Sequence, residues 1–123
     1  MNNGIDLFTA SVYDIEVGKN RTLDTNITCT YLSGDTTMYF DFSGYTGATL
    51  TIKNVSGTIL MTFSTTDNSI TLLPNGVFNL YKTADEMNTI RAGQYNYDMV
   101  LLKADVKRAF LYGNITFIQN ISN

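Results

Sequence analysis

Few side chains of this chain could carry acid–base, nucleophilic or metal chemistry. The 123 residues include no His and a single Cys, Cys29. The commonest general base and metal ligand is therefore missing, and neither a Ser-His-Asp nor a Cys-His nucleophile can be built. Cys29 falls in the middle of a predicted strand on its apolar side, a position typical of a buried, inert thiol. We expect no enzyme and no cofactor.

The carboxylates are the remaining chemical groups. Asp14 with Glu16, or Asp35 with Asp41, are the pairs that could in principle serve glycoside hydrolysis or bind calcium. The eleven acids are dispersed along the chain, and solvated surface positions are their ordinary place. Calcium-loop, phosphate-loop and dinucleotide patterns are absent from the sequence. We therefore expect no metal site.

Aromatic side chains could instead bind a sugar or a protein partner. The chain has 8 Tyr and 7 Phe and no Trp. Most of them fall at inward-facing positions of predicted strands, so a core role is expected for them. Tyr45 lies in a glycine-flanked loop and is the best candidate for an exposed aromatic that contacts a partner.

Charge and length narrow the class of protein. The net charge is −3 with scattered Lys and Arg, which argues against nucleic acid as the main ligand. No stretch is apolar enough to span a bilayer, and the first residues lack the pattern of a signal peptide. A lone cysteine forms no disulfide within the chain. We expect one domain, made in a reducing cytoplasm, without a membrane partner.

Short strands separated by turns must position these residues. Leu23, Ile27 and Tyr31 share one face of a strand that alternates with polar residues, as in a half-buried antiparallel strand. Asn54 to Gly57 predicts a hairpin turn. Thr83 and Glu86 have the spacing of a capping box, and Gly93 suits the end of a helix.

These patterns together predict an all-β antiparallel sandwich. It has about 7–8 strands, one short helix near residues 84–92, and a single domain over residues 11–123. Residues 1–10 are expected to form either an N-terminal arm or an edge strand. If they form an arm, Ile5, Leu7 and Phe8 are its apolar contacts with a partner.

Two resemblances converge near Tyr95. This residue precedes Tyr97 by two positions, as the corner tyrosine precedes the second cysteine of immunoglobulin-like domains. Cys29 would match the first cysteine, whereas Tyr97 occupies the second position and the core Trp is missing. Only the sandwich architecture carries over, so this resemblance implies that the all-β antiparallel sandwich is Ig-like.

The second resemblance extends from about residue 20 to the end. The chain resembles the small β-sandwich at the N-terminus of the baseplate upper protein family of tailed phages. The matching pieces are the Asp41–Tyr45 turn with the strand to Lys53, the Thr83–Ile90 helix, the Gly93-Gln94-Tyr95-Asn96-Tyr97-Asp98 motif, and Leu111–Ile115 around Gly113.

This resemblance implies a non-enzymatic structural protein of a tailed-phage virion. An accessory capsid (head decoration) protein is the first expectation, and a neck, tail or baseplate adaptor is the alternative. Its partners would be the major capsid protein or neck and tail proteins, with homo-oligomers also compatible. It would be synthesised in the bacterial host cytoplasm and found in the virion. A carbohydrate- or receptor-binding module is the alternative from another class.

Overall fold

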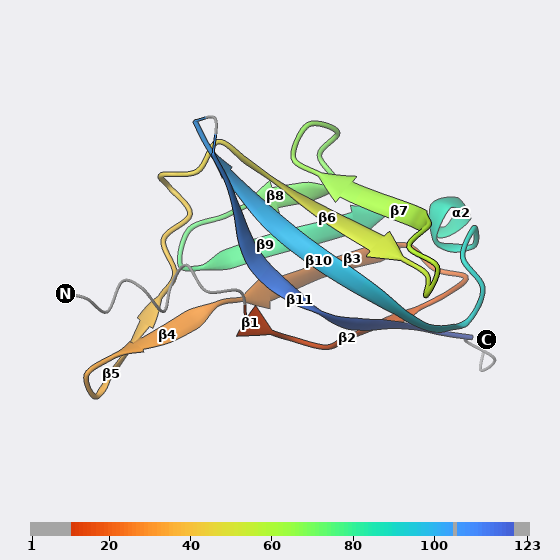
Figure 1. The fold of residues 1–123 in the computed structure, drawn as a ribbon, viewed down its shortest axis with the longest axis horizontal. Coiled ribbons are helices and arrows are strands. Elements are labelled where there is room, and N and C mark those ends of the chain that lie inside the picture. The colour runs from red at the N-terminus through yellow and green to blue at the C-terminus, as the bar shows by residue number, and fades with distance from the viewer. Residues whose placement is uncertain (1–10, 105, 120–123) are drawn as a thin grey trace.

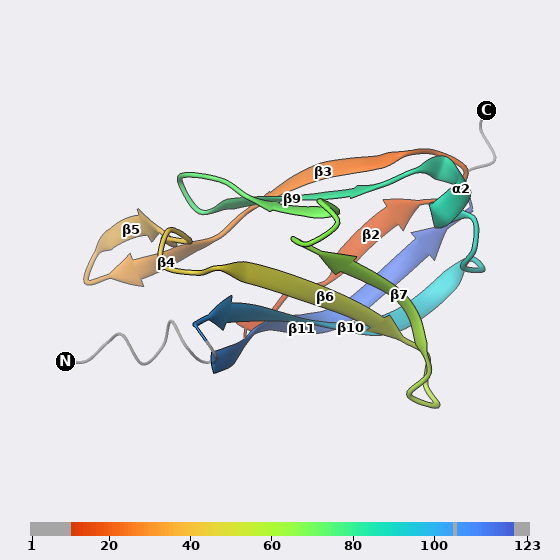
Figure 2. The same cartoon turned by 90° about the horizontal axis from the view of Figure 1, so that it is seen from above.

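The computed structural model describes residues 11–104 and 106–119, which form two facing β-sheets (Figures 1 and 2). The larger sheet has the order β1 (Ser11–Val12), β11 (Val106–Ile118), β10 (Gly93–Lys103), β6 (Gly47–Lys53) and β7 (Ile59–Ser64), and β2 (Ile15–Gly18) also pairs with β11. The smaller sheet has the order β3 (Leu23–Thr28), β9 (Val77–Lys82) and β8 (Ile70–Leu72). The expected partner contacts Ile5, Leu7 and Phe8, and the choice between arm and edge strand, lie outside the described residues.

The strand order is that of immunoglobulin-like sandwiches. β10 lies between β11 and β6 in one sheet, and β9 lies between β3 and β8 in the other. These correspond to the G-F-C and B-E-D orders of that architecture. The predicted all-β sandwich with one short helix is confirmed.

A separate two-stranded ribbon interrupts this arrangement. β4 (Thr30–Ser33) and β5 (Thr36–Tyr39) pair with each other and, within the described residues, with no strand of either sheet. Figure 2 shows the ribbon projecting beyond one end of the two sheets. In sequence it lies between β3 and β6, so it is an insertion into the sandwich.

The strand number and the pairing differ from the prediction. The described residues hold eleven strand segments, not seven or eight. β1 and β2 are separated at Tyr13 and Asp14, and the strand expected from Leu23 to Tyr31 breaks at Cys29. β1 and β2 run parallel to β11, whereas an antiparallel sheet was expected.

The core lies between the two sheets. Alternate residues of each strand point inward, as a pleated strand requires, and the largest side chains with essentially no exposed surface are Phe63, Phe78, Phe117, Leu50, Ile52, Ile70, Leu80, Met87, Met99, Leu101 and Ile115. Burying one such side chain contributes roughly 1.5–3 kcal/mol. This apolar core is what holds the sheets face to face.

The helix is shorter than the predicted 84–92. α2 spans Ala84–Met87, and the capping box at its start is present: Glu86 N–H donates to Thr83 Oγ1 at 3.2 Å, and Thr83 N–H donates to Glu86 Oε1 at 3.0 Å. The helix ends at Asn88, after which Thr89 N–H bonds back to the Glu86 carbonyl. Gly93 does not end the helix but begins β10. One turn suffices because Met87 anchors it in the core.

The corner-tyrosine comparison holds in the structure. Tyr95 Oη donates to the Arg91 carbonyl at 2.8 Å, four residues upstream. This is the bond that immunoglobulin-like domains use at the corner before their F strand. It fixes the chain between α2 and β10.

Candidate functional site

The ribbon leaves the sandwich at Cys29. The Cys29 N–H donates to the Gly76 carbonyl at 2.7 Å, and the Cys29 carbonyl accepts from Phe40 N–H at 3.0 Å. Gly76 has a φ of +74°, and a Cβ there would collide with the Cys29 carbonyl oxygen. Glycine is therefore required, since only it allows the turn between β8 and β9 to approach so closely. β3–β9 pairing ends there, and β4 continues outward alone with β5.

Both faces of the ribbon carry large apolar side chains. Tyr31 and Met38 are opposite each other on one face, and Leu32 and Tyr39 lie on the other. Leu32 is 71% exposed, Tyr39 58% and Met38 41%. A two-stranded ribbon is at best marginally stable in water by itself. Leu32 and Tyr39 are thus exposed on one face of the ribbon, and Met38 is exposed on the other.

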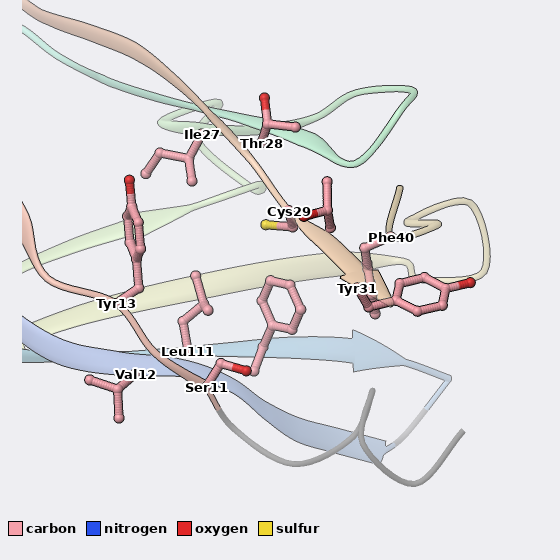
Figure 3. A pocket seen from close by; sticks show the side chains of 11 residues that line it. Ser11, Val12, Tyr13, Ile27, Thr28, Cys29, Tyr31, Phe40 and Leu111 are labelled. Atoms are coloured by element: carbon pink, nitrogen blue, oxygen red, sulfur yellow. The ribbon is translucent and has the colours of Figure 1, made fainter. Parts of the chain in front are cut away.

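A cavity of about 260 Å³ lies at the base of the ribbon (Figure 3). Ile27 and Cys29 line it from the small sheet, and Ser11 and Leu111 line it from the large sheet. Phe40 contributes a further apolar wall. The cavity lies where the edges of the two sheets diverge, and this region is called the seam below. Its lining is mixed, with apolar Ile27 and Phe40 beside polar Ser11 and Thr30.

The Cys29 thiol faces this seam without being a nucleophile. It is half-buried, and burial raises the pKa of the thiol to about 11. Because only the thiolate is nucleophilic, Cys29 is unreactive near neutral pH. The structure therefore supports the interpretation of an inert thiol.

On the large-sheet side of the seam, Tyr97 binds the chain segment between β1 and β2. Its hydroxyl donates to the Tyr13 carbonyl at 2.5 Å, and Asp14 Oδ1 accepts from Asn114 N–H at 3.0 Å. Burial and the nearby Asp14 carboxylate raise the pKa of Tyr97, so it remains a donor at any physiological pH. Gly113 has a φ of +156°, and a Cβ there would be 2.6 Å from the Tyr13 carbonyl oxygen. These contacts hold the Tyr13–Asp14 segment, which joins β1 to β2, against β10 and β11.

Tyr45 is half-buried, whereas the sequence suggested an exposed ring. It packs against the core cluster and stacks on Phe40, with ring centroids 5.9 Å apart. The Lys103 ammonium lies 5.6 Å from the Tyr45 ring centroid. The ring lines a shallow groove with Leu72 and Pro74, away from the seam cavity. Its role as a partner contact stays a prediction.

Carboxylates of Asp41 and Asp67 accept hydrogen bonds from serines two residues further along their loops. Asp67 accepts from both the hydroxyl and the amide of Ser69, and these bonds lower its pKa. Ser43 lowers the pKa of Asp41 in the same way. Asp35 lies in the turn of the ribbon, so the expected alternative of an Asp35–Asp41 pair is separated by the length of β5. No group of three or more metal-ligating side chains forms in residues 11–104 and 106–119.

Among the helices in the described part of the chain, none is long and apolar enough to cross a membrane.

Comparison with known proteins shows the fold alone. No protein-family model matches the chain, and no curated protein matches it in sequence. Among solved structures, the chain is similar to part of the endo-beta-1,4-mannanase from Thermotoga petrophila, with a TM-score of 0.50 and 11% sequence identity. The match covers 91% of this chain and 18% of the mannanase chain, so the chain spans less than a fifth of that protein.

The sequence predicted the turn at Ser33-Gly34-Asp35, but not that the ribbon lies outside both sheets and not the seam cavity. One signal was present: Tyr31 is followed directly by Leu32, and Met38 by Tyr39. Adjacent apolar residues on both arms of a hairpin place apolar surface on both faces. The cavity had no such signal, because residues distant in sequence form it.

Proposed function

We propose that this chain is a non-catalytic docking domain that binds an apolar protein surface through the β4–β5 ribbon, in a tailed-phage virion. The observation that carries the docking role is the exposure of Leu32, Met38 and Tyr39 on a ribbon that belongs to neither sheet. Exposed apolar groups of this kind are stabilised when a partner covers them.

The chemistry of the ribbon favours a protein partner. Asp35 is the one charged residue from Thr30 to Tyr39, so the ribbon offers no cations for phosphates or an anionic lipid surface. Aromatic and Met side chains are the types enriched at the centres of protein interfaces. The partner surface is therefore apolar and weakly charged.

The virion setting rests on the resemblance to phage baseplate upper proteins. Within it, the partner is the major capsid protein, and the chain decorates the head after synthesis in the bacterial cytoplasm. A neck, tail or baseplate protein is the alternative partner. A homo-oligomer that docks as a unit is compatible with both.

The test is incorporation into particles from a phage that encodes the chain. Leu32→Asp combined with Tyr39→Asp is expected to lower the amount per purified virion at least about tenfold, since central apolar anchors contribute 2 kcal/mol or more. Val55→Asp is the matched control, because Val55 is 96% exposed in the β6–β7 turn, outside the ribbon. Quantitative mass spectrometry gives the readout. If the native chain is absent from virions, the virion location is refuted. If all variants are incorporated equally, docking through the ribbon is refuted.

A carbohydrate-binding module is the second candidate. A shallow groove of about 410 Å³ beside Tyr112, lined also by Asp14, Asn96 and Asn114, favours it. Tyr112 is 46% exposed, and an aromatic face flanked by amides and a carboxylate can stack and hydrogen-bond a sugar. A glycan array with the native chain and Tyr112→Ala tests it. Loss of a signal in the variant supports this candidate, and a blank array for the native chain eliminates it.

A further inference from the structure

The outer edge of β5 presents backbone groups for pairing. Phe40 N–H donates to the Cys29 carbonyl at 3.0 Å, and hydrogen-bonded and non-hydrogen-bonded pairs alternate along an antiparallel ribbon. In the observed register the N–H and C=O groups of Thr37 and Tyr39 therefore point away from β4. Within residues 11–104 and 106–119, β4 is the strand that pairs with β5. An edge of this kind is a site for strand addition.

The features that protect the edge strands of natural proteins are missing from this edge. Such edges usually carry Lys, Pro or a bulge. Residues 30–40 contain neither Lys nor Pro, and Asp35 in the turn is their one charged side chain. The β4–β5 register contains no bulge, and all four residues of β5 are exposed. Because the ribbon projects beyond one end of the two sheets (Figure 2), an incoming strand can reach this edge without crossing the body of the domain.

The edge of β5 is complementary to itself about a two-fold axis at Met38. This axis places Thr37 of one copy opposite Tyr39 of the second copy, and Tyr39 of the first opposite Thr37 of the second. Both members of each pair present their N–H and C=O groups outward, so the two pairs exchange both of their hydrogen bonds. An axis at Thr37 or at Tyr39 would instead bring Asp35 or Asp41, which lie outside β5, opposite a strand residue.

We propose that two copies of this chain pair through β5 and form an antiparallel four-stranded sheet across this two-fold axis. A two-stranded ribbon is at best marginally stable in water, whereas three or more strands with an apolar face are stable. β5 carries no charge, so the two copies meet without repulsion. Tyr39 of each copy packs beside Thr37 of the other on one face, and the two Met38 side chains meet on the opposite face.

This inference goes beyond the proposed function and does not depend on the virion setting, because it concerns the purified chain alone. Leu32 and Tyr39 lie on one face of the ribbon. In the dimer these side chains of both copies share one face of the four-stranded sheet. The dimer therefore presents a larger apolar surface to a partner than a single ribbon does.

Removal of one outward N–H tests the pairing in the full chain. Thr37→Pro deletes this donor and preserves the β4–β5 bonds, because the Thr37 N–H points away from β4. We expect the native chain to be a dimer by size-exclusion chromatography with light scattering. The Kd of the dimer should rise at least about tenfold in Thr37→Pro, since the two-fold axis makes the loss occur twice. Thr30→Pro is the matched control, because it makes the same change at the opposite edge of the ribbon, and it should leave the Kd unchanged.

Three outcomes of this experiment would overturn the proposal. The first is a native chain that is monomeric at every soluble concentration. The second is a Kd that is unchanged in Thr37→Pro or rises equally in Thr30→Pro. The third is assembly into open-ended oligomers, because pairing about a two-fold axis closes at the dimer.

A cysteine at position 38 gives a second readout that does not rely on a Pro substitution. In a non-hydrogen-bonded antiparallel pair the Cα atoms are about 4.5 Å apart, which a disulfide can span. Met38→Cys in a Cys29→Ala background should therefore form a disulfide between copies under mild oxidation. Thr36→Cys in the same background is the matched control, because the axis separates its two copies by roughly 13 Å along the strands, beyond the reach of a disulfide. A missing Met38→Cys crosslink, or equal yields in the two variants, would contradict the pairing.

Discussion

The hydroxyl of Tyr97 on β10 donates to the backbone carbonyl of Tyr13, 84 residues earlier in the chain, at 2.5 Å. This bond fastens the first described strands to the middle of the large sheet. Tyr97 stands where immunoglobulin domains place the second cysteine of their inter-sheet disulfide. A part-buried hydrogen bond to the Tyr13–Asp14 segment is thus made from the position that forms a covalent link in those domains.

Removal of that hydroxyl should destabilise the domain. Tyr97→Phe keeps the ring, which is 3% exposed, but leaves the Tyr13 carbonyl without this donor. We expect a loss of about 1 kcal/mol in the free energy of unfolding, as for a typical hydrogen bond, because the bond is part-buried. Urea denaturation measures it. Tyr112→Phe is the control, because its ring is 46% exposed, and an equal loss in the control would contradict the interpretation.

The corner bond of Tyr95 should act locally. Tyr95→Phe removes the donor to Arg91, so amide hydrogen exchange should accelerate between α2 and the start of β10. The loss of global stability should be about 1 kcal/mol, as for a typical hydrogen bond. Tyr81→Phe, at an exposed position on β9, serves as the comparison. Unchanged exchange in this segment would show that the corner does not depend on the bond.

Gly76 should tolerate no side chain. Gly76→Ala adds a Cβ against the Cys29 carbonyl oxygen at a φ of +74°. Gly57→Ala is the matched control, with a φ of +87° but no atom within 4 Å of the new Cβ. Both variants incur about 1–2 kcal/mol of left-handed backbone strain, and the steric clash adds to it at Gly76 alone. Equal melting temperatures for the two variants would contradict the close approach of this turn to Cys29.

The Asp67–Ser69 contact should make stability depend on acid pH. Its hydrogen bonds lower the pKa of Asp67, and the Lys82 ammonium lowers it further. A carboxyl with a lowered folded-state pKa contributes stability above its unfolded pKa of about 3.9, and the contribution is lost as pH falls through the folded value. The contribution is small because Asp67 is exposed to solvent screening.

Denaturation midpoints between about pH 5 and pH 2 test this linkage. Asp67→Asn and Ser69→Ala should both show a shallower decline with acidification than the native chain. Asp67→Asn removes the carboxylate and Ser69→Ala removes the hydroxyl that donates to it. A shallower decline of stability with acidification in both variants therefore identifies this pair as the cause. A decline as steep as the native one in both variants would exclude the contact as its source.

Local signals were sufficient for several elements. The alternation of β6 and β10, the hairpin at Asn54 to Gly57, and the capping box of Thr83 and Glu86 all depend on residues close in sequence. The length of the helix was overestimated: α2 ends at Asn88, whose side chain accepts a hydrogen bond from the N–H of Asn20, 68 residues earlier. The break in the strand at Cys29 was missed as well, because its N–H donates to the Gly76 carbonyl, 47 residues away.

By itself the sequence determined the class of the fold and the chemistry that the chain lacks. Periods of two and the composition, with no His and one Cys, are properties of the residues alone. Only the tertiary structure decided where the candidate site lies. The ribbon projects because a turn near Gly76 diverts the chain at Cys29. The seam exists because the edges of two sheets diverge between Ser11 and Thr30. Contacts between distant segments create both features, and no local pattern encodes such contacts.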